Sequence, residues 1–215
     1  IRDFLVNAWG FAADAAEVST AHCNAAANVC DQLISLTVGS TTENNQKRFT
    51  LNGAFTTDQG LESVLEAMAA TMAGSVVYGG EWQINAGAWT APVLTLTDDD
   101  LAGLVEVVQA DTPTDELFND HLARARNLCR IFVERNRAGQ TLRYPAKLPA
   151  WGLQVNDRVT LTHAELGISA LTYRVTDWQW AVGDVVMLTL QRDAAGIWDL
   201  ADAATADPTP NTDLP

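Results

Sequence analysis

The sequence is poor in cysteine, and this scarcity excludes a disulfide-stabilised secreted domain. Its 215 residues include three cysteines, Cys23, Cys30 and Cys129, too few for a disulfide framework. Cys23 and Cys30 are seven residues apart, which on a helix would leave them roughly 10 Å from each other, too far for a bond. We therefore expect small buried side chains and a reducing compartment.

Long apolar runs are also missing. No stretch approaches the roughly 18 apolar residues that a membrane-spanning helix needs, so we expect no membrane span. The first residues, IRDFLVNAWGF, have neither the basic start nor the apolar centre of a secretion signal, and no initiator methionine precedes them. We expect a piece of a longer chain. Hydrophobic residues make up 47% of the sequence, which is typical of a soluble globular protein.

Basic residues are scarce, and the net charge is −14. A protein this acidic is not expected to bind nucleic acid directly or sequence-specifically. The charge is uneven, at −14 for residues 1–120, +6 for 121–174 and −6 for 175–215. This alternation predicts that acidic and basic faces meet, within one chain or between neighbouring chains.

Residue types that carry catalysis are present, but their spacing does not indicate an active site. His22, His121 and His163 are far apart and form no HxxxH or HExxH pattern. No serine lies in a GxSxG elbow, and the glycines form neither a phosphate loop nor a dinucleotide fingerprint. The aspartate run at 98–100 lacks the alternating ligands of a calcium loop, so Asp98 is interpreted as the cap of a short turn. We expect no catalytic residue, no cofactor and no metal.

Helical periodicity marks two segments of the first half. A helix is expected over 18–36, where apolar residues recur at steps of three and four, and a second over 58–73. Asp58 is the expected cap of the second helix, and Gly74 its expected stop.

Strand patterns surround these helices. We expect strands over 47–55 and within 75–109, the latter beginning with a hairpin at Gly79-Gly80, and a polar loop over 39–46. A helix laid over one face of a small antiparallel sheet would bury both.

The whole pattern predicts an α+β protein with four consecutive parts. Residues 1–112 are expected to form an α+β domain, and 113–137 an Arg-rich connecting helix. Residues 138–200 contain only strand patterns, which favour a small β-barrel or sandwich. Residues 201–215 are rich in proline, threonine and aspartate and read as a linker.

Tryptophan and arginine supply the candidate interaction residues. Several of the seven tryptophans fall in predicted strands or joints, where large aromatic area serves core and interface packing. The Arg-rich helix could bind nucleic acid or anionic lipid, but a solvated face paired with acidic neighbours is favoured by the total charge. The candidate interface residues are Trp82, Trp89, Arg124, Arg130, Trp178 and Trp180. The alternative function is a carbohydrate-binding module that uses Trp82, Trp89 or Trp151.

One long stretch resembles a known family. Residues 48–104 run RFTLNGAFTTDQGLESVLEAMAATMAGSVVYGGEWQINAGAWTAPVLTLTDDDLAGL. They resemble the central region of tail-tip proteins of long, non-contractile-tailed phages, the family of the host-specificity protein J of lambda-like phages. The shared layout is a strand with an Asn-Gly turn, a helix ending in Met-Ala-Gly, a VY-GG-W hairpin and a PV-TLTDD strand.

A later segment, from Leu122 to Trp180, resembles the next part of the same family. There an Arg-rich helix leads into a β-barrel marked by turns that correspond to Asn156-Asp157 and Leu166-Gly167. In relatives a β-rich segment separates the Phe118-Asn119 pair from the helix, whereas here the helix follows at once. Either this member is shortened near Asn119-His121, or a stretch is missing from the sequence.

The resemblance covers roughly residues 1–200. It implies a structural, non-enzymatic virion component that is assembled in the host cytoplasm and forms the central hub of a tail tip. Such hubs are trimeric, join the tail tube and distal tail proteins to fibres or receptor-binding modules, and close the channel. A tail-associated hydrolase is a further alternative, which needs a paired acid and base that the sequence does not indicate.

Overall fold

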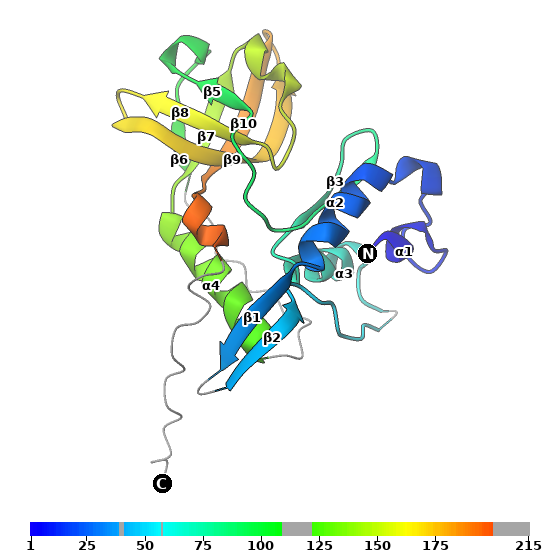
Figure 1. Cartoon of the computed structure of the whole chain (residues 1–215). Coiled ribbons are helices and arrows are strands. Elements are labelled where there is room, and N and C mark those ends of the chain that lie inside the picture. Colours follow the sequence, from blue (N-terminus) through cyan, green and yellow to red (C-terminus); the bar gives the residue numbers. More distant parts are fainter. Residues whose placement is uncertain (39–40, 57, 109–121, 200–215) are drawn as a thin grey trace. The chain divides into compact units, whose positions relative to one another are not determined.

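The computed structural model describes residues 1–38, 41–56, 58–108 and 122–199, which fold as two compact units (Figure 1). The first unit holds the described residues of 1–87 and 122–132 together with Asp199, and the second holds 88–108 and 133–198. Both helices and sheets are present, so the α+β class expected from the sequence is confirmed. Within the described ranges, none of the helices combines the length and the apolar composition needed to cross a bilayer.

The first unit is built from short helices and two hairpins. Its elements are α1 (Arg2–Val6), η1 (Ala15–Glu17), α2 (Thr20–Cys30), the hairpin of β1 (Leu33–Val38) and β2 (Thr41–Lys47), α3 (Leu61–Ala70), and the hairpin of β3 (Ser75–Tyr78) and β4 (Trp82–Asn85). The helix α4 (Leu122–Ala138) contributes its residues up to Phe132 to this unit.

The β3–β4 hairpin is the centre of the first unit. Tyr78 pairs with Trp82 and Ser75 with Asn85, and Gly80 takes the positive φ, +93°, that the connecting loop requires. The helix α2 packs against β4, and α3 packs against β3. The expected cover of helices over a small antiparallel sheet is therefore present.

The second unit is a six-stranded sheet in the order β5-β8-β9-β10-β7-β6. Its strands are β5 (Leu94–Leu96), β6 (Glu106–Val108), β7 (Thr141–Ala146), β8 (Arg158–His163), β9 (Ile168–Ala181) and β10 (Val185–Arg192). The 3₁₀ turns η2 (Asp98–Asp100), η3 (Leu148–Gly152) and η4 (Ala195–Trp198) connect or follow them. The β5–β8 pair is parallel, and the other neighbouring strands are antiparallel.

Alternation along the strands creates the core of this sheet. In β10, Val186, Leu188 and Leu190 are completely buried, whereas the residues between them are partly exposed. Leu96 of β5 and Tyr144 of β7 join the same apolar cluster. Burying each aliphatic side chain contributes about 1.5–3 kcal/mol, so this face supplies most of the unit's hydrophobic stabilisation.

The helix predicted over 18–36 is too long. The helix α2 ends at Cys30, and Leu33–Val38 forms β1 instead. Ile34 and Val38 are β-branched, and as a strand this segment pairs with β2, with one irregularity between Ile34 and Leu36. The polar loop expected over 39–46 is also wrong from Thr41 onward, because β2 pairs through its backbone and needs no apolar side chains.

Two further predictions in the first half fail at the level of single elements. Residues 48–55 form no strand, because no strand in the described part of the chain pairs with them, and β2 ends at Lys47. The second helix is shorter than 58–73 and is capped by Gly60 instead of Asp58, with the carbonyl of Gly60 accepting from the Val64 N–H at 3.1 Å.

The acidic run at 98–100 forms the predicted short turn, but Asp98 is not its cap. The cap is Thr97, whose hydroxyl and N–H both donate to one carboxylate oxygen of Asp100 at 3.0 Å.

The largest correction concerns residues 88–108, which the sequence placed in the first domain. Leu94–Leu96 pairs with Val159–Leu161 of β8, and Glu106–Val108 pairs with Thr141–Arg143 of β7. Both strands thus belong to the second unit, at the two ends of its sheet. They do not pair with each other in the described part of the chain, so the barrel expected over 138–200 is an open mixed sheet. The predicted start of the Arg-rich helix, the Phe118-Asn119 junction and the 201–215 linker lie outside the described residues.

Replacing Gly74 with alanine should destabilise the first unit. A Cβ atom there would collide with the backbone carbonyl of Asn85 in β4, which cannot move without disturbing the hairpin. We expect Gly74→Ala to lower the free energy of unfolding in urea by about 1–3 kcal/mol, measured by circular dichroism.

Gly79→Ala is the matched control, because nothing lies within 4 Å of the Cβ it would add. We expect it to stay within about 0.5 kcal/mol of the parent. Equal stabilities for the two variants would contradict this account of Gly74.

Candidate interaction sites

The candidate interface residues fall in both units. Trp82 begins β4 in the first unit, whereas Trp89, Trp178 and Trp180 belong to the second. The structure brings Trp178 and Trp180 together with Trp151, and it gives Trp89 a different role.

A β-bulge turns Trp178 and Trp180, which share a face of β9, toward the apolar face of the sheet. Leu190 of β10 pairs with Val175, but the next residue, Thr189, pairs with Asp177, so Thr176 is an extra residue in β9. The shift places Trp178 opposite Leu188. Directly paired residues share a face of the sheet. Trp178 and Trp180 therefore lie on the same buried face as Val175, which precedes the bulge.

Trp151 of η3 covers the end of this row. Its ring centroid lies 5.3 Å from that of Trp178 and 4.5 Å from that of Trp180, with interplanar angles of 70° and 90°. Trp178 packs against the apolar core, and its buried indole N–H has no hydrogen-bond partner among the described residues. Trp151 is 55% exposed and Trp180 45% exposed.

Leu148, three residues before Trp151 in a 3₁₀ turn, lies on the same side of that turn and is also exposed. We call Leu148, Trp151 and Trp180 the tryptophan patch. Exposed apolar side chains that gather on a surface are typical of surfaces that contact another molecule.

Trp89 is occupied by a neighbouring cation. The guanidinium carbon of Arg158 lies 4.9 Å from the centroid of the Trp89 ring and 5.5 Å from that of Trp198. Arg158 donates from Nε to Asp193 Oδ2 at 2.8 Å, and its Nη atoms donate to Thr90 Oγ1 at 2.7 Å and to the Ala88 carbonyl at 2.8 Å. Trp89 is therefore part of an internal network and not a free platform.

The partner carboxylate is saturated as well. Asp193 Oδ1 accepts from Trp198 Nε1 and from the backbone N–H of Ala194, each at 2.8 Å. The side chains of Arg158 and Asp193 are 5% and 4% exposed, so both charges are removed from water. Burial lowers the pKa of Arg158, and the carboxylate of Asp193 opposes that shift and holds the charge.

Two more arginines lie close to this pair. Arg174 donates to Gln191 Oε1 at 2.9 Å, and Arg135 stacks on Trp198 at 5.9 Å. Burial, followed by the charge of Arg135, lowers the pKa of Arg174 to about 9, which still leaves it protonated at neutral pH. No sequence pattern indicates this network, because its members are separated by up to dozens of residues and match no motif.

Of the two candidate arginines of α4, the structure describes the side-chain contacts of Arg130 alone. Arg130 donates to the Asp199 carbonyl and, at 3.4 Å, to Asn127 Oδ1. The side chain of Arg124 lies outside the described part of the chain.

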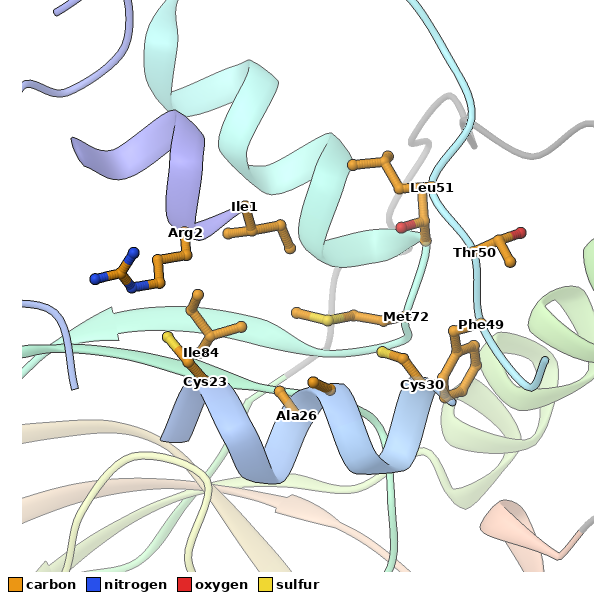
Figure 2. Close-up of a pocket in the computed structure, with 12 residues that line it drawn as sticks. Ile1, Arg2, Cys23, Ala26, Cys30, Phe49, Thr50, Leu51, Met72 and Ile84 are labelled. Atoms are coloured by element: carbon orange, nitrogen blue, oxygen red, sulfur yellow. The ribbon is translucent and has the colours of Figure 1, made fainter. Parts of the chain in front are cut away.

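An apolar cavity of about 280 Å³ lies in the first unit (Figure 2). Cys23, Ala26 and Cys30 point into it from α2, and Met72 and Ile84 lie opposite them. Arg2 is the one charged side chain among the lining residues.

The cavity has the character of a small apolar binding space. Burial, with a contribution from Asp31, raises the pKa of the Cys30 thiol, which keeps it protonated and unreactive at neutral pH. The lining contains no histidine and no carboxylate that could serve as a base for either thiol. An apolar group could fit, but no reaction is indicated there.

The polar clusters considered in the sequence also stay separate. His163 Nδ1 lies 2.9 Å from Asp98 Oδ1, although the two groups are not aligned as a hydrogen bond. His22 accepts or donates at Ser19 Oγ, 2.9 Å away, and His121 lies outside the described residues. In the described ranges, no group of three or more His, Cys, Asp or Glu side chains is arranged to hold a metal ion.

Comparison with known proteins finds solved structures with a similar fold but no matching family. No protein-family model matches the chain, and no curated protein matches it. Among solved structures, it is similar to a chain in the virion of a native gene transfer agent particle, with a TM-score of 0.55 and 18% identity over 69% of this chain. It spans 42% of that chain.

A second solved structure is a tail protein from Neisseria meningitidis MC58. The identity is 17%, the TM-score is 0.43, and the match covers 80% of this chain and 63% of that one.

Removing the Arg158 side chain should strongly destabilise the second unit. Arg158→Met leaves the Asp193 carboxylate buried without its cation, so we expect the free energy of unfolding to fall by about 3–5 kcal/mol in urea titrations. Arg137→Met is the control, because the Arg137–Glu134 pair is exposed and should contribute less than about 1 kcal/mol. Similar losses in both variants would contradict the importance of the buried pair.

Proposed function

We propose that this chain is a structural component of the tail of a phage or phage-like particle, and that it forms part of the central hub at the tail tip. In this role it joins the tail tube and distal tail proteins to fibres or receptor-binding modules, and it closes the channel without catalysing a reaction. The hub is a homotrimer and is part of the virion.

The observation that carries this proposal is the fold likeness to a chain of a gene transfer agent virion, with a TM-score of 0.55 over 69% of the sequence. The identity of 18% is too low for shared function to follow from it alone. A second, independent support is the ordered series of sequence motifs from Arg48 to Leu104, which resembles the layout of the tail-tip family in most of its elements.

The surface of the second unit fits a protein that functions within an assembly. The tryptophan patch exposes large apolar side chains, as is typical of surfaces that bind another protein. Val182, in the turn between β9 and β10, is fully exposed two residues after Trp180. We propose that this end of the sheet contacts a neighbouring copy or another tail protein.

Electron microscopy of labelled particles tests the assignment. Gold-labelled antibodies raised against this chain should bind at the distal end of the tail, at one end of each particle. Label on the head or along the whole tail tube would contradict a hub role.

Sedimentation velocity tests the oligomeric state and the patch. We expect the protein to sediment as a trimer and Trp180→Ser to shift it toward the monomer, because the substitution removes apolar area from the proposed contact. Leu104→Ser is the control, since Leu104 is 87% exposed outside the patch and should leave the trimer intact. A protein that stays monomeric at high concentration would count against the trimeric hub.

The alternative of a carbohydrate-binding module has weaker support. The exposed rings of Trp151 and Trp180 meet at 90° and do not form one flat platform for a sugar, and Trp89 already carries Arg158. Trp82 is the remaining candidate of that alternative, and its surroundings suggest a different ligand.

A further inference from the structure

A hollow of about 470 Å³ in the first unit shares no lining residue with the apolar cavity or with the tryptophan patch. It is lined by residues 11–14, Glu17, Tyr78 and Trp82. Three of these lining residues are aromatic and two are acidic. Neither the motif series nor the proposed hub role accounts for this combination.

The walls of the hollow are held in place by the backbone. The N–H of Ser19 donates to the Trp82 carbonyl at 2.9 Å, and Val18 forms a parallel bridge with Trp82, so the segment before α2 is tied to β4. On the other side, the Phe11 N–H donates to the Phe4 carbonyl at 3.2 Å, and Ala12 has a φ of +51°. A non-glycine residue in that region is strained, and such strain persists where the surroundings impose a particular shape.

The aromatic rings form inclined walls. The Phe11 and Trp82 centroids are 5.4 Å apart at 60°, and those of Tyr78 and Trp82 are 5.3 Å apart at 61°. A sugar stacks on one flat face, whereas an organic cation is attracted by several ring faces turned toward it within about 6 Å. The inclined rings therefore favour a cation.

The charge of the hollow points the same way. Asp14 Oδ1 accepts from the Ala16 N–H at 3.0 Å, and the side chains of both Asp14 and Glu17 are exposed. Among the described residues, neither carboxylate forms an ion pair with a basic side chain. Residues 1–87 contain nine acidic and three basic side chains, so the surroundings add to the negative potential.

We infer that this hollow binds the guanidinium or ammonium group of an arginine or lysine side chain presented by another protein chain. The rings of Phe11, Tyr78 and Trp82 contact the cation and its alkyl stem, and Asp14 and Glu17 neutralise its charge. The inference does not depend on the hub role, because it rests on the chemistry of the hollow.

Nuclear magnetic resonance with a matched pair of small probes tests the inference. The intact protein is titrated with N-acetyl-arginine methylamide and, separately, with N-acetyl-citrulline methylamide, which is similar in shape but uncharged. We expect the arginine probe to shift the indole N–H signal of Trp82 in a saturable way, and the citrulline probe to leave it in place. Added salt should weaken the arginine response, because exposed charges are screened.

A double variant removes the charge and keeps the fold. In Asp14→Asn with Glu17→Gln, the amide at position 14 still accepts the Ala16 N–H, and we expect the affinity for the arginine probe to fall about fivefold or more. Glu66→Gln is the control, since Glu66 is exposed on α3 of the same unit, does not line the hollow, and should leave the affinity unchanged.

Tyr78→Leu tests the aromatic contribution separately. Tyr78 is 57% exposed, so its loss should leave the fold intact and weaken binding of the arginine probe about threefold. Three results would overturn the inference: no saturable shift with the arginine probe, equal shifts with both probes, or stronger binding of N-acetylglucosamine than of the arginine probe. The last result would assign the hollow to a glycan.

Discussion

The buried guanidinium of Arg158 is the interaction on which the second unit depends. Its donors contact Asp193, Thr90 and the Ala88 carbonyl, and its flat face stacks on Trp89. Arg158 begins β8, and these partners come from the segment before β5 and from the residue that follows β10, so one side chain joins three separate parts of the chain. A buried charge is tolerated only with this degree of pairing, which makes the arrangement nearly all-or-none.

The sequence predicts the fold well wherever the signal is local. Alternation in β10 and the Gly79-Gly80 turn of the β3–β4 hairpin depend on neighbouring residues, and both elements are present. It fails where a partner strand decides the outcome. The composition of Leu33–Val38 suits either a helix or a strand, and the segment is a strand because it pairs with β2. Leu94–Leu96 belongs to the six-stranded sheet because it pairs in parallel with β8.

The candidate sites show the same division. Composition selected Trp178, Trp180 and Trp82 as candidate interaction residues, and all three lie in aromatic clusters. Trp89 was selected for the same reason, yet it stacks on Arg158 inside the unit. The bulge at Thr176, which turns Trp178 and Trp180 to the apolar face of the sheet, follows from strand register, and register is set by tertiary pairing that no single stretch encodes.

The origin of strands β5 and β6 has a consequence for synthesis. Both outer strands of the six-stranded sheet come from residues 94–108, whereas the four inner strands come from 141–192. A ribosome therefore makes the two outer strands before any strand with which they pair, and they must wait with unpaired backbone until the inner strands emerge. The reverse also holds: a fragment that begins after residue 138 would have β7 and β8 as bare edges, and bare edges invite aggregation. Residues 88–108 thus cover the edges of β7 and β8, which would otherwise be open to pairing with strands of other protein chains.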